Sequence, residues 1–211
     1  MKLSKLISTI LHPIFIPILM LYLSLKLIPN IGFAIAGYLN FIYLVLIFST
    51  IILPLLSIFF LIKNNLISSL EMNDYKERSM PIFITAVWMS YGYYKLTDVL
   101  TLSPFLKAEF LGAIIILVIA SIISKYWKIS LHMLGIGGAV GALFGLNILF
   151  GGLLKIISTF ILLSGILGVA RLNQKAHNHN QVYTGFLVGF VIEASSILFF
   201  QNYIHNFNFS F

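Results

Sequence analysis

The stretch FLKAEFLGAIIILVIASIISKYWKISLHMLGIGGAVGALFGLNILF, residues 105–150, decides the fold class of this chain. It holds two long apolar runs, 105–126 and 131–150, which are separated by only a few polar residues. A membrane-spanning helix needs about 20 mostly apolar residues, and each run has about that length. Backbone groups in lipid must hydrogen-bond within their own segment, so these runs predict transmembrane helices. The strands of a membrane barrel would instead be shorter and would alternate between apolar and polar residues.

The composition extends this prediction from two segments to the whole protein. The chain has 211 residues, of which 60% are hydrophobic and only 9% are charged. A typical soluble domain is about a quarter charged, so these few charges cannot cover a soluble surface. The apolar content also excludes a disordered chain. We therefore expect an all-α, polytopic transmembrane helix bundle of about six to seven spans, forming a single integral membrane domain over 1–211.

Seven apolar segments approach the length of a span. They run over about 7–28, 31–62, 81–100, 105–126, 131–150, 153–170 and 182–200. The second segment contains Pro54 and is longer than a perpendicular crossing needs, so we expect it to be tilted, kinked or to project from the bilayer. The first contains Pro13 and Pro17 and follows a basic N-terminus, as in a signal peptide. It is too long for one and has no small-residue cleavage site after it, which favours a retained span.

Polar residues gather at three points along the chain. Two are longer stretches, 63–80 and 171–181, and the third is the brief stretch 125–132 between them. Two predicted spans separate each polar point from the next, so seven spans would bring all three to the same membrane face. The other connections are short, and the sequence therefore predicts one polar face and one with few polar groups.

The charge pattern favours a lipid environment over nucleic acid. The chain has 13 Lys and Arg against 6 Asp and Glu, a net charge of +7. Most of these bases flank apolar segments, as residues at the bilayer surface do. No nucleic-acid partner is expected, and the expected surroundings are the lipid bilayer. The chain has no cysteine, which excludes disulfides, thiol catalysis and cysteine-ligated metals.

The three polar points share a chemistry that suits a phosphate ester. They offer cations, a serine and histidines: Lys76 and Arg78 in the first, Ser130 and His132 in the second, and Arg171 and His177 in the third. Arginine and lysine bind phosphate oxygens, while one histidine can attack phosphorus and another can protonate the leaving oxygen. Cationic side chains can carry the charge stabilisation, and the sequence has no aspartate-rich magnesium motif. We therefore expect no metal and no cofactor.

The order and spacing of these residues resemble those of the type 2 phosphatidic acid phosphatase superfamily of integral membrane enzymes. That family carries a Lys/Arg-plus-Arg-Pro motif, a Pro-Ser-Gly-His motif and a Ser-Arg-x5-His-x3-Asp motif. The corresponding stretches here are KERSMP at 76–81, ISLH at 129–132, and AR at 170–171 followed by His177 and Gln181 at the family's spacing. Tyr183 and Gly185 also resemble the family's entry into its last helix. The motifs cover about twenty residues, and the likeness in span layout covers most of the chain.

The resemblance implies a metal-independent membrane phosphatase that hydrolyses a lipid phosphate or diphosphate headgroup. By this likeness His177 would be the nucleophile that forms a phosphohistidine, and His132 would protonate the leaving group. Gln181 would take the place of the residue that orients the nucleophile. The residues implied to bind the phosphoryl oxygens are Lys76, Arg78, Arg171 and Ser130.

Departures from the family's pattern leave alternatives open. Gln181 stands where the family has an aspartate, and it can accept a hydrogen bond but supplies no charge. Loss of a carboxylate from a comparable histidine–carboxylate pair can cost several orders of magnitude in rate. The second motif also has Ile129 and Leu131 in place of Pro and Gly. A catalytically impaired relative that binds anionic lipid headgroups is therefore the alternative, and a small transporter is a third possibility, although no internal repeat supports it.

Two ionisable residues and the orientation have more than one interpretation. Glu193 lies inside the last span, where it either belongs to a site or bonds a neighbouring helix. His12 either lines the site or is an interfacial histidine.

We expect an integral protein of the bacterial inner (cytoplasmic) membrane. The excess of basic residues at the membrane face that carries the three polar points favours a cytoplasmic position for that face. Three of these basic residues are the proposed phosphate ligands, however, and many members of the resembled family act on the outer face. Both orientations therefore stay open.

Overall fold

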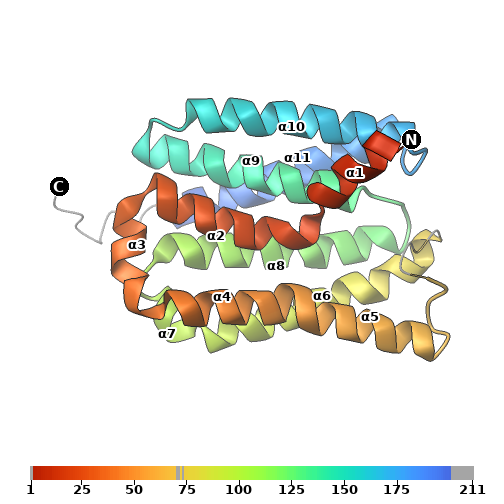
Figure 1. The fold of residues 1–211 in the computed structure, drawn as a ribbon, viewed down its shortest axis with the longest axis horizontal. Coiled ribbons are helices and arrows are strands. Elements are labelled where there is room, and N and C mark those ends of the chain that lie inside the picture. Colours follow the sequence, from red (N-terminus) through yellow and green to blue (C-terminus); the bar gives the residue numbers. More distant parts are fainter. Residues whose placement is uncertain (1, 70–71, 73, 201–211) are drawn as a thin grey trace.

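The protein is an all-helical bundle in the computed structural model, which describes residues 2–69, 72 and 74–200. Six helical segments in these ranges are long and apolar enough to cross a membrane: Lys2–Leu27, Pro29–Lys63, Pro104–Ser124, Leu131–Phe150, Leu154–Asn173 and His179–Phe199. A further helix, α6 (Ser79–Lys95), has 17 residues, which is at the short end of the range for a span. The long helices lie side by side in Figure 1. The predicted all-α, polytopic class is confirmed.

The N-terminal segment consists of two helices. α1 (Lys2–Ile10) ends before His12, the 3₁₀ turn η1 (Pro13–Phe15) follows, and α2 (Ile16–Leu27) runs in a different direction (Figure 1). A residue before proline is driven out of the helical region, and His12 is extended with φ −70° and ψ 134°. The side chain of His12 then caps the turn, because its Nδ1 accepts the backbone N–H of Ile14 at 3.3 Å.

The second segment is irregular at two places. Its elements are α3 (Pro29–Ile35), η2 (Ala36–Tyr38), α4 (Leu39–Ile47), the π-helical turn η3 (Phe48–Ile52) and α5 (Leu53–Lys63). α3 lies across one end of the bundle, whereas α4 and α5 form one long rod (Figure 1). Pro54 follows the π turn closely. Proline has no N–H to donate and its ring crowds the carbonyl four residues earlier, and a wider turn relieves that crowding.

The closest helix pair is α9 (Leu131–Phe150) with α11 (His179–Phe199). A Cβ added at Gly137 would collide with the backbone of Phe186, and one added at Gly185 would lie 2.8 Å from the carbonyl oxygen of Ser130. Their backbones therefore meet directly, as small residues permit in membrane helices. The two helices are parallel, so the residues that begin α9 and α11 lie next to each other.

An alanine at Gly189 is expected to separate this pair. Its Cβ would collide with the carbonyl of Leu134, whereas a Cβ at Gly165 on α10 (Leu154–Asn173) meets nothing within 4 Å. We expect Gly189→Ala to destabilise the protein by about 1–3 kcal/mol, because overpacking forces the backbone to move. Gly165→Ala should leave stability unchanged or raise it, because alanine favours helix. Thermal unfolding in detergent measures both, and equal midpoints would contradict the close packing of α9 on α11.

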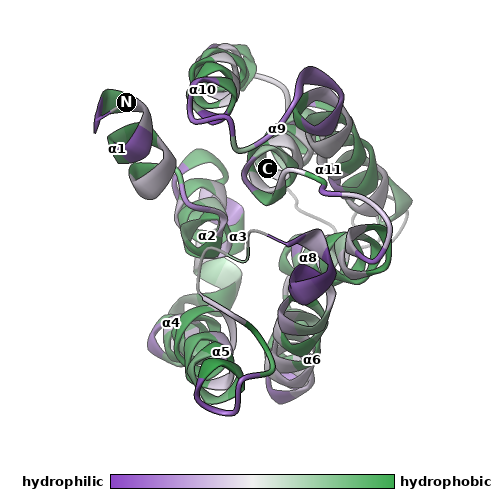
Figure 2. Cartoon of the chain, turned by 90° about the vertical axis from the view of Figure 1, so that its right-hand side faces the viewer, coloured by the Kyte–Doolittle hydropathy of each residue, from purple (hydrophilic) through white to green (hydrophobic). Residues whose placement is uncertain are grey.

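The three polar connections lie at the same end of the bundle. They are the segment with η4 (Tyr75–Arg78) before α6, the link between α8 (Pro104–Ser124) and α9, and the link between α10 and α11 (Figure 1, right). Figure 2 looks onto this end and shows hydrophilic residues at the helix ends and in the connections. Leu70, Glu71 and Asn73 of the first polar stretch lie outside the described residues. The opposite end carries α3 and the short helix α7 (Thr97–Leu100).

Candidate functional site

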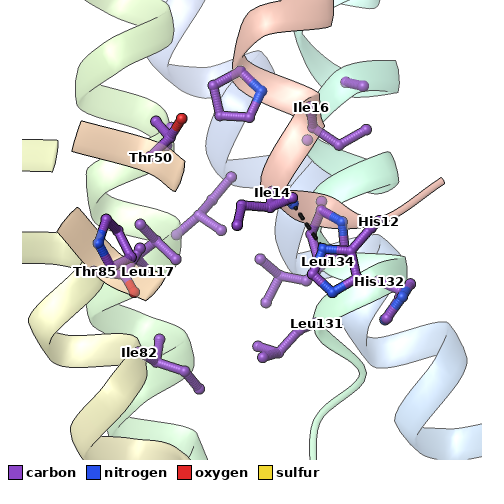
Figure 3. A pocket seen from close by; sticks show the side chains of 18 of the residues that line it. His12, Ile14, Ile16, Thr50, Ile82, Thr85, Leu117, Leu131, His132 and Leu134 are labelled. Atoms are coloured by element: carbon purple, nitrogen blue, oxygen red, sulfur yellow. Dashed lines mark hydrogen bonds between the residues drawn. The ribbon is translucent and has the colours of Figure 1, made fainter. Parts of the chain in front are cut away.

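A cavity of about 1040 Å³ lies among the helices and reaches the polar end of the bundle. Residues from all three polar points line it: Arg78, Lys128, His132, Arg171 and His177. Much of the remaining wall is apolar and comes from α2, α6, α8 and α9. Figure 3 shows part of this wall, with Ile82 and Leu117 on one side and Leu134 on the other. One space therefore combines a cationic mouth with an apolar interior.

His177 is held in one orientation by the start of α11. Its side chain is only 8% exposed, and its Nδ1 lies 3.1 Å from Oε1 of Gln181. The same oxygen accepts the backbone N–H of Asn178 at 3.2 Å, while the side chain of Asn178 accepts the backbone N–H of Gln181 at 3.0 Å. Because a backbone N–H can only donate, this atom of Gln181 is an acceptor and Nδ1 of His177 must carry a proton. In the neutral imidazole, Nε2 therefore keeps its lone pair.

The surroundings of His177 favour that neutral form. Burial is the main cause that lowers its pKa to about 4, and the charges of Arg171, Arg78 and Lys128 lower it further, although the hydrogen bond that His177 donates to Gln181 opposes them. An imidazole with this pKa is unprotonated at neutral pH. His177 then offers an unprotonated Nε2 beside three cations, which suits nucleophilic attack on an anion.

The cations at the mouth are close enough to influence one another. Burial lowers the pKa of Arg78, and burial together with the charges of Arg78 and Arg171 lowers the pKa of Lys128. Nε of Arg171 is buried and has no hydrogen-bond partner among the described residues. Among the described residues, the carboxylates that line the cavity are Glu109 and Glu193, which belong to the membrane-buried part of α8 and α11. A site with several like charges close together is suited to a bound anion such as phosphate.

Three of the residues expected from the sequence do not line the cavity. Lys76 is exposed on η4, where its backbone N–H donates to Oδ1 of Asp74 at 3.0 Å. Ser130 is fully buried before α9, and its Oγ has no hydrogen-bond partner among the described residues. Gln181 reaches the site only through His177. Lys128 also lines the cavity but is not among the residues expected from the sequence, because a lysine next to an apolar segment ordinarily lies at the bilayer surface. Its position two residues before Ser130 was the available signal.

Two lysines therefore make a matched pair for mutation. If Lys128 binds the anion, Lys128→Ala should raise the Kd for inorganic phosphate by about tenfold, because a charge-assisted contact is lost. Lys76→Ala should change this Kd less than about twofold, since an exposed charge outside the cavity is screened by solvent. Titration of both variants with phosphate at the same ionic strength tests this. A larger effect from Lys76→Ala would contradict the assignment of Lys128.

His132 is hydrogen-bonded to the N-terminal helix α1. Its Nε2 lies 3.0 Å from the backbone carbonyl oxygen of Ser8, so that nitrogen must donate and Nδ1 is the acceptor in the neutral ring. His12 packs against it edge-to-face, with ring centroids 5.0 Å apart. Figure 3 labels both side chains in the cavity wall. Nε2 of Gln174 donates to the carbonyl of Ser4 at 2.7 Å and to Oγ of Ser8 at 2.8 Å. Helix α1 is thus part of the site, and His12 lines the cavity.

Comparison of the chain with protein-family models, curated proteins and solved structures finds no match. Among the described residues, no group of three or more His, Cys, Asp or Glu side chains is arranged to hold a metal ion. His177, Arg78, Arg171 and Lys128 line the same cavity.

Proposed function

We propose that the protein is an integral membrane phosphatase that hydrolyses a lipid phosphate or diphosphate through a phosphohistidine at His177. The observation that carries this proposal is the free Nε2 of His177 in a cavity that also holds Arg78, Arg171 and Lys128. The motif resemblance to type 2 phosphatidic acid phosphatases supports it independently. The apolar wall behind the cationic mouth fits the chain of a lipid whose phosphate lies at the mouth.

The chemistry would proceed in two displacements at phosphorus. Nε2 of His177 attacks, the bond to the leaving oxygen breaks, and that oxygen takes a proton. Water then attacks the phosphohistidine, releases inorganic phosphate and regenerates the imidazole. The cations stabilise the charge on the phosphoryl oxygens in both steps. The positive ring of the intermediate keeps its Nδ1–H on Gln181, which orients it but does not neutralise its charge.

His132 is the proposed proton donor to the leaving oxygen. Its Nε2 proton is already donated to the carbonyl of Ser8. To act as the acid, His132 must either release that carbonyl, which requires α1 to move, or take a second proton on Nδ1. The position of α1 is therefore part of the proposed mechanism.

The second candidate is a protein that binds anionic lipid headgroups without turning them over. The uncharged Gln181 beside His177 and the bond between His132 and Ser8 favour it, because both would slow catalysis without preventing binding. The two candidates share the cationic mouth and differ only in turnover.

Release of inorganic phosphate separates the two candidates. Purified protein in detergent micelles is incubated with a lipid phosphate or a lipid diphosphate in the presence of a metal chelator. A phosphatase gives linear phosphate release that rises with protein concentration. A headgroup binder gives saturable binding of the same lipid with no release above that of micelles alone, and this result would overturn the proposed function.

We expect that kcat/KM does not fall as the pH is lowered through the ordinary pKa of histidine. The pKa of His177 is lowered to about 4, so its nucleophilic neutral form persists at all pH values above that and is lost only below it. We expect kcat/KM to hold between pH 7 and about pH 5 and to fall near pH 4. An acid limb near pH 6.5, the ordinary pKa of histidine, would contradict the burial of His177.

A further inference from the structure

The part of the cavity inside the membrane carries two carboxyl groups that the proposed phosphatase chemistry does not use. Glu109 lies on α8 and Glu193 on α11, and both line the cavity. Glu193 follows the start of α11 by 14 residues, which is about 21 Å along a helix. The hydrocarbon core is about 30 Å thick, so this end of the cavity lies within the bilayer and far from the cationic mouth.

Glu109 and Glu193 lie near enough for their charges to interact. The carboxyl of Glu193 packs directly against Gly112 of α8, where an added Cβ would collide with its oxygen atoms. Glu109 precedes Gly112 by three residues and therefore lies on the same face of α8, one turn away. From α2, Oγ of the fully buried Ser24 donates to Oε1 of Glu109 at 2.7 Å. Gly112 leaves the room that allows α8 and α11 to present both carboxyl groups to one space.

Glu193 has no partner of its own. It is 5% exposed, faces the cavity, and has no hydrogen bond or cation beside it among the described residues. The elements packed around the pair supply no positive charge there: α2 contributes Ser24, and α9 contributes small and apolar residues such as Ala139 and Ala142. The cations that line the cavity belong to its mouth, at the ends of other helices.

Two neighbouring carboxylates without a cation are unstable in this environment. Each would lose its hydration in the membrane interior, and the two charges would repel each other. A proton held between them removes one charge and supplies an O–H donor to the other group, as in paired carboxyl groups that share one proton. A proton is also the smallest ligand that can remove one charge from the two carboxyl groups and join them by a hydrogen bond.

We propose that Glu109 and Glu193 form a proton-binding site at the deep end of the cavity, holding one shared proton at neutral pH. Ser24 holds one oxygen of Glu109, and both glutamates line the cavity. The proton reaches the site from the mouth through the same cavity. This proposal does not depend on phosphatase activity, because it concerns only the occupancy of the two carboxyl groups.

A lipid-soluble carbodiimide tests this directly, because it reacts with protonated carboxyl groups in apolar surroundings. The full-length protein in lipid vesicles is treated over a range of pH, and labelled peptides are quantified by mass spectrometry. We expect labelling of Glu193, Glu109 or both at pH 7, decreasing as the pH rises. Asp74 and Asp98 are exposed and serve as internal controls that should stay unlabelled at pH 7. Absence of labelling at both glutamates at pH 7 would overturn the proposal.

A variant and a competing cation sharpen the test. Glu109→Gln keeps an acceptor for Ser24 but removes the like charge, so the pH midpoint for labelling of Glu193 should move to lower values. An unchanged midpoint would contradict a shared proton. Protection by sodium chloride but not by choline chloride at equal ionic strength would also overturn it, since the occupant would then be a metal cation. If Glu109→Gln does not fold, the wild-type titration and the sodium competition decide alone.

Discussion

Phosphate release is expected to fall by at least about a thousandfold when His177 is replaced by alanine, because the variant lacks the group that we propose attacks phosphorus. The neighbouring histidines are engaged in other contacts, because Nε2 of His132 donates to the carbonyl of Ser8 and Nδ1 of His12 accepts the N–H of Ile14. Arg78 and Arg171 would remain, so binding of the lipid phosphate should persist while turnover is lost.

His179→Ala is the matched control for His177→Ala. His179 is exposed at the first position of α11, where its ring stacks on Tyr183 with centroids 6.3 Å apart, and it does not line the cavity. Its removal should leave phosphate release within about twofold of the wild type, as expected for a surface change. Initial rates at saturating lipid phosphate measure both variants. Activity retained in His177→Ala, or lost equally in both, would rule out His177 as the nucleophile.

Gln181→Glu is expected to raise turnover by about tenfold or more at neutral pH. A carboxylate beside the Nδ1–H of His177 would stabilise the positive ring that forms with the phosphohistidine, which the neutral amide cannot do. Glutamate has the same length as glutamine and preserves the capping contacts with Asn178. Aspartate is one methylene shorter, so we expect Gln181→Asp to give a smaller gain despite matching the family's motif.

The same substitution should change the pH dependence. A carboxylate next to His177 raises the pKa of the imidazole from about 4, so the acid limb of kcat/KM should move to higher pH. Measuring kcat and the pH profile together tests the role of Gln181. If the acid limb of kcat/KM moves to higher pH but kcat does not rise, the missing negative charge at residue 181 does not limit the rate. Absence of turnover in both the wild type and Gln181→Glu would favour the headgroup binder.

The helical class of the fold was predictable because its signal is local. The apolar runs of 105–150 are long enough to span a bilayer whatever surrounds them. The break at His12 was harder to place, since the apolar pattern continues on both sides of Pro13. The position of α1 depends on the contacts of Ser4 and Ser8 with Gln174, which lies 166 residues further along the chain than Ser8. No local pattern encodes such a contact.

The candidate site was likewise predictable only in part from the sequence. Arg171, His177 and Gln181 follow one another across a single short connection, so their spacing alone placed them at the ends of two adjacent helices. Lys76 and Lys128 gave similar signals in the sequence, and only the turn of η4 and the approach to α9 determine which of them lines the cavity.

The deep carboxyl pair had even less signal in the sequence. Glu193 was recognised as an unusual residue within a span, but Glu109 was missed. Its proximity to Glu193 depends on the space that Gly112 leaves between α8 and α11, and on the hydrogen bond from Ser24 of α2. These are contacts between segments far apart in the chain, and spacing within one helix does not reveal them.

The central claim is that His177 becomes covalently phosphorylated. The protein is mixed with a lipid phosphate, quenched at neutral or alkaline pH within the first turnover to preserve phosphohistidine, and digested for mass spectrometry. We predict one phosphoryl group on the peptide that contains His177, absent from His177→Ala and present in His179→Ala. Phosphate release without any phosphoryl group on the protein, or with the group on another residue, would contradict the claim.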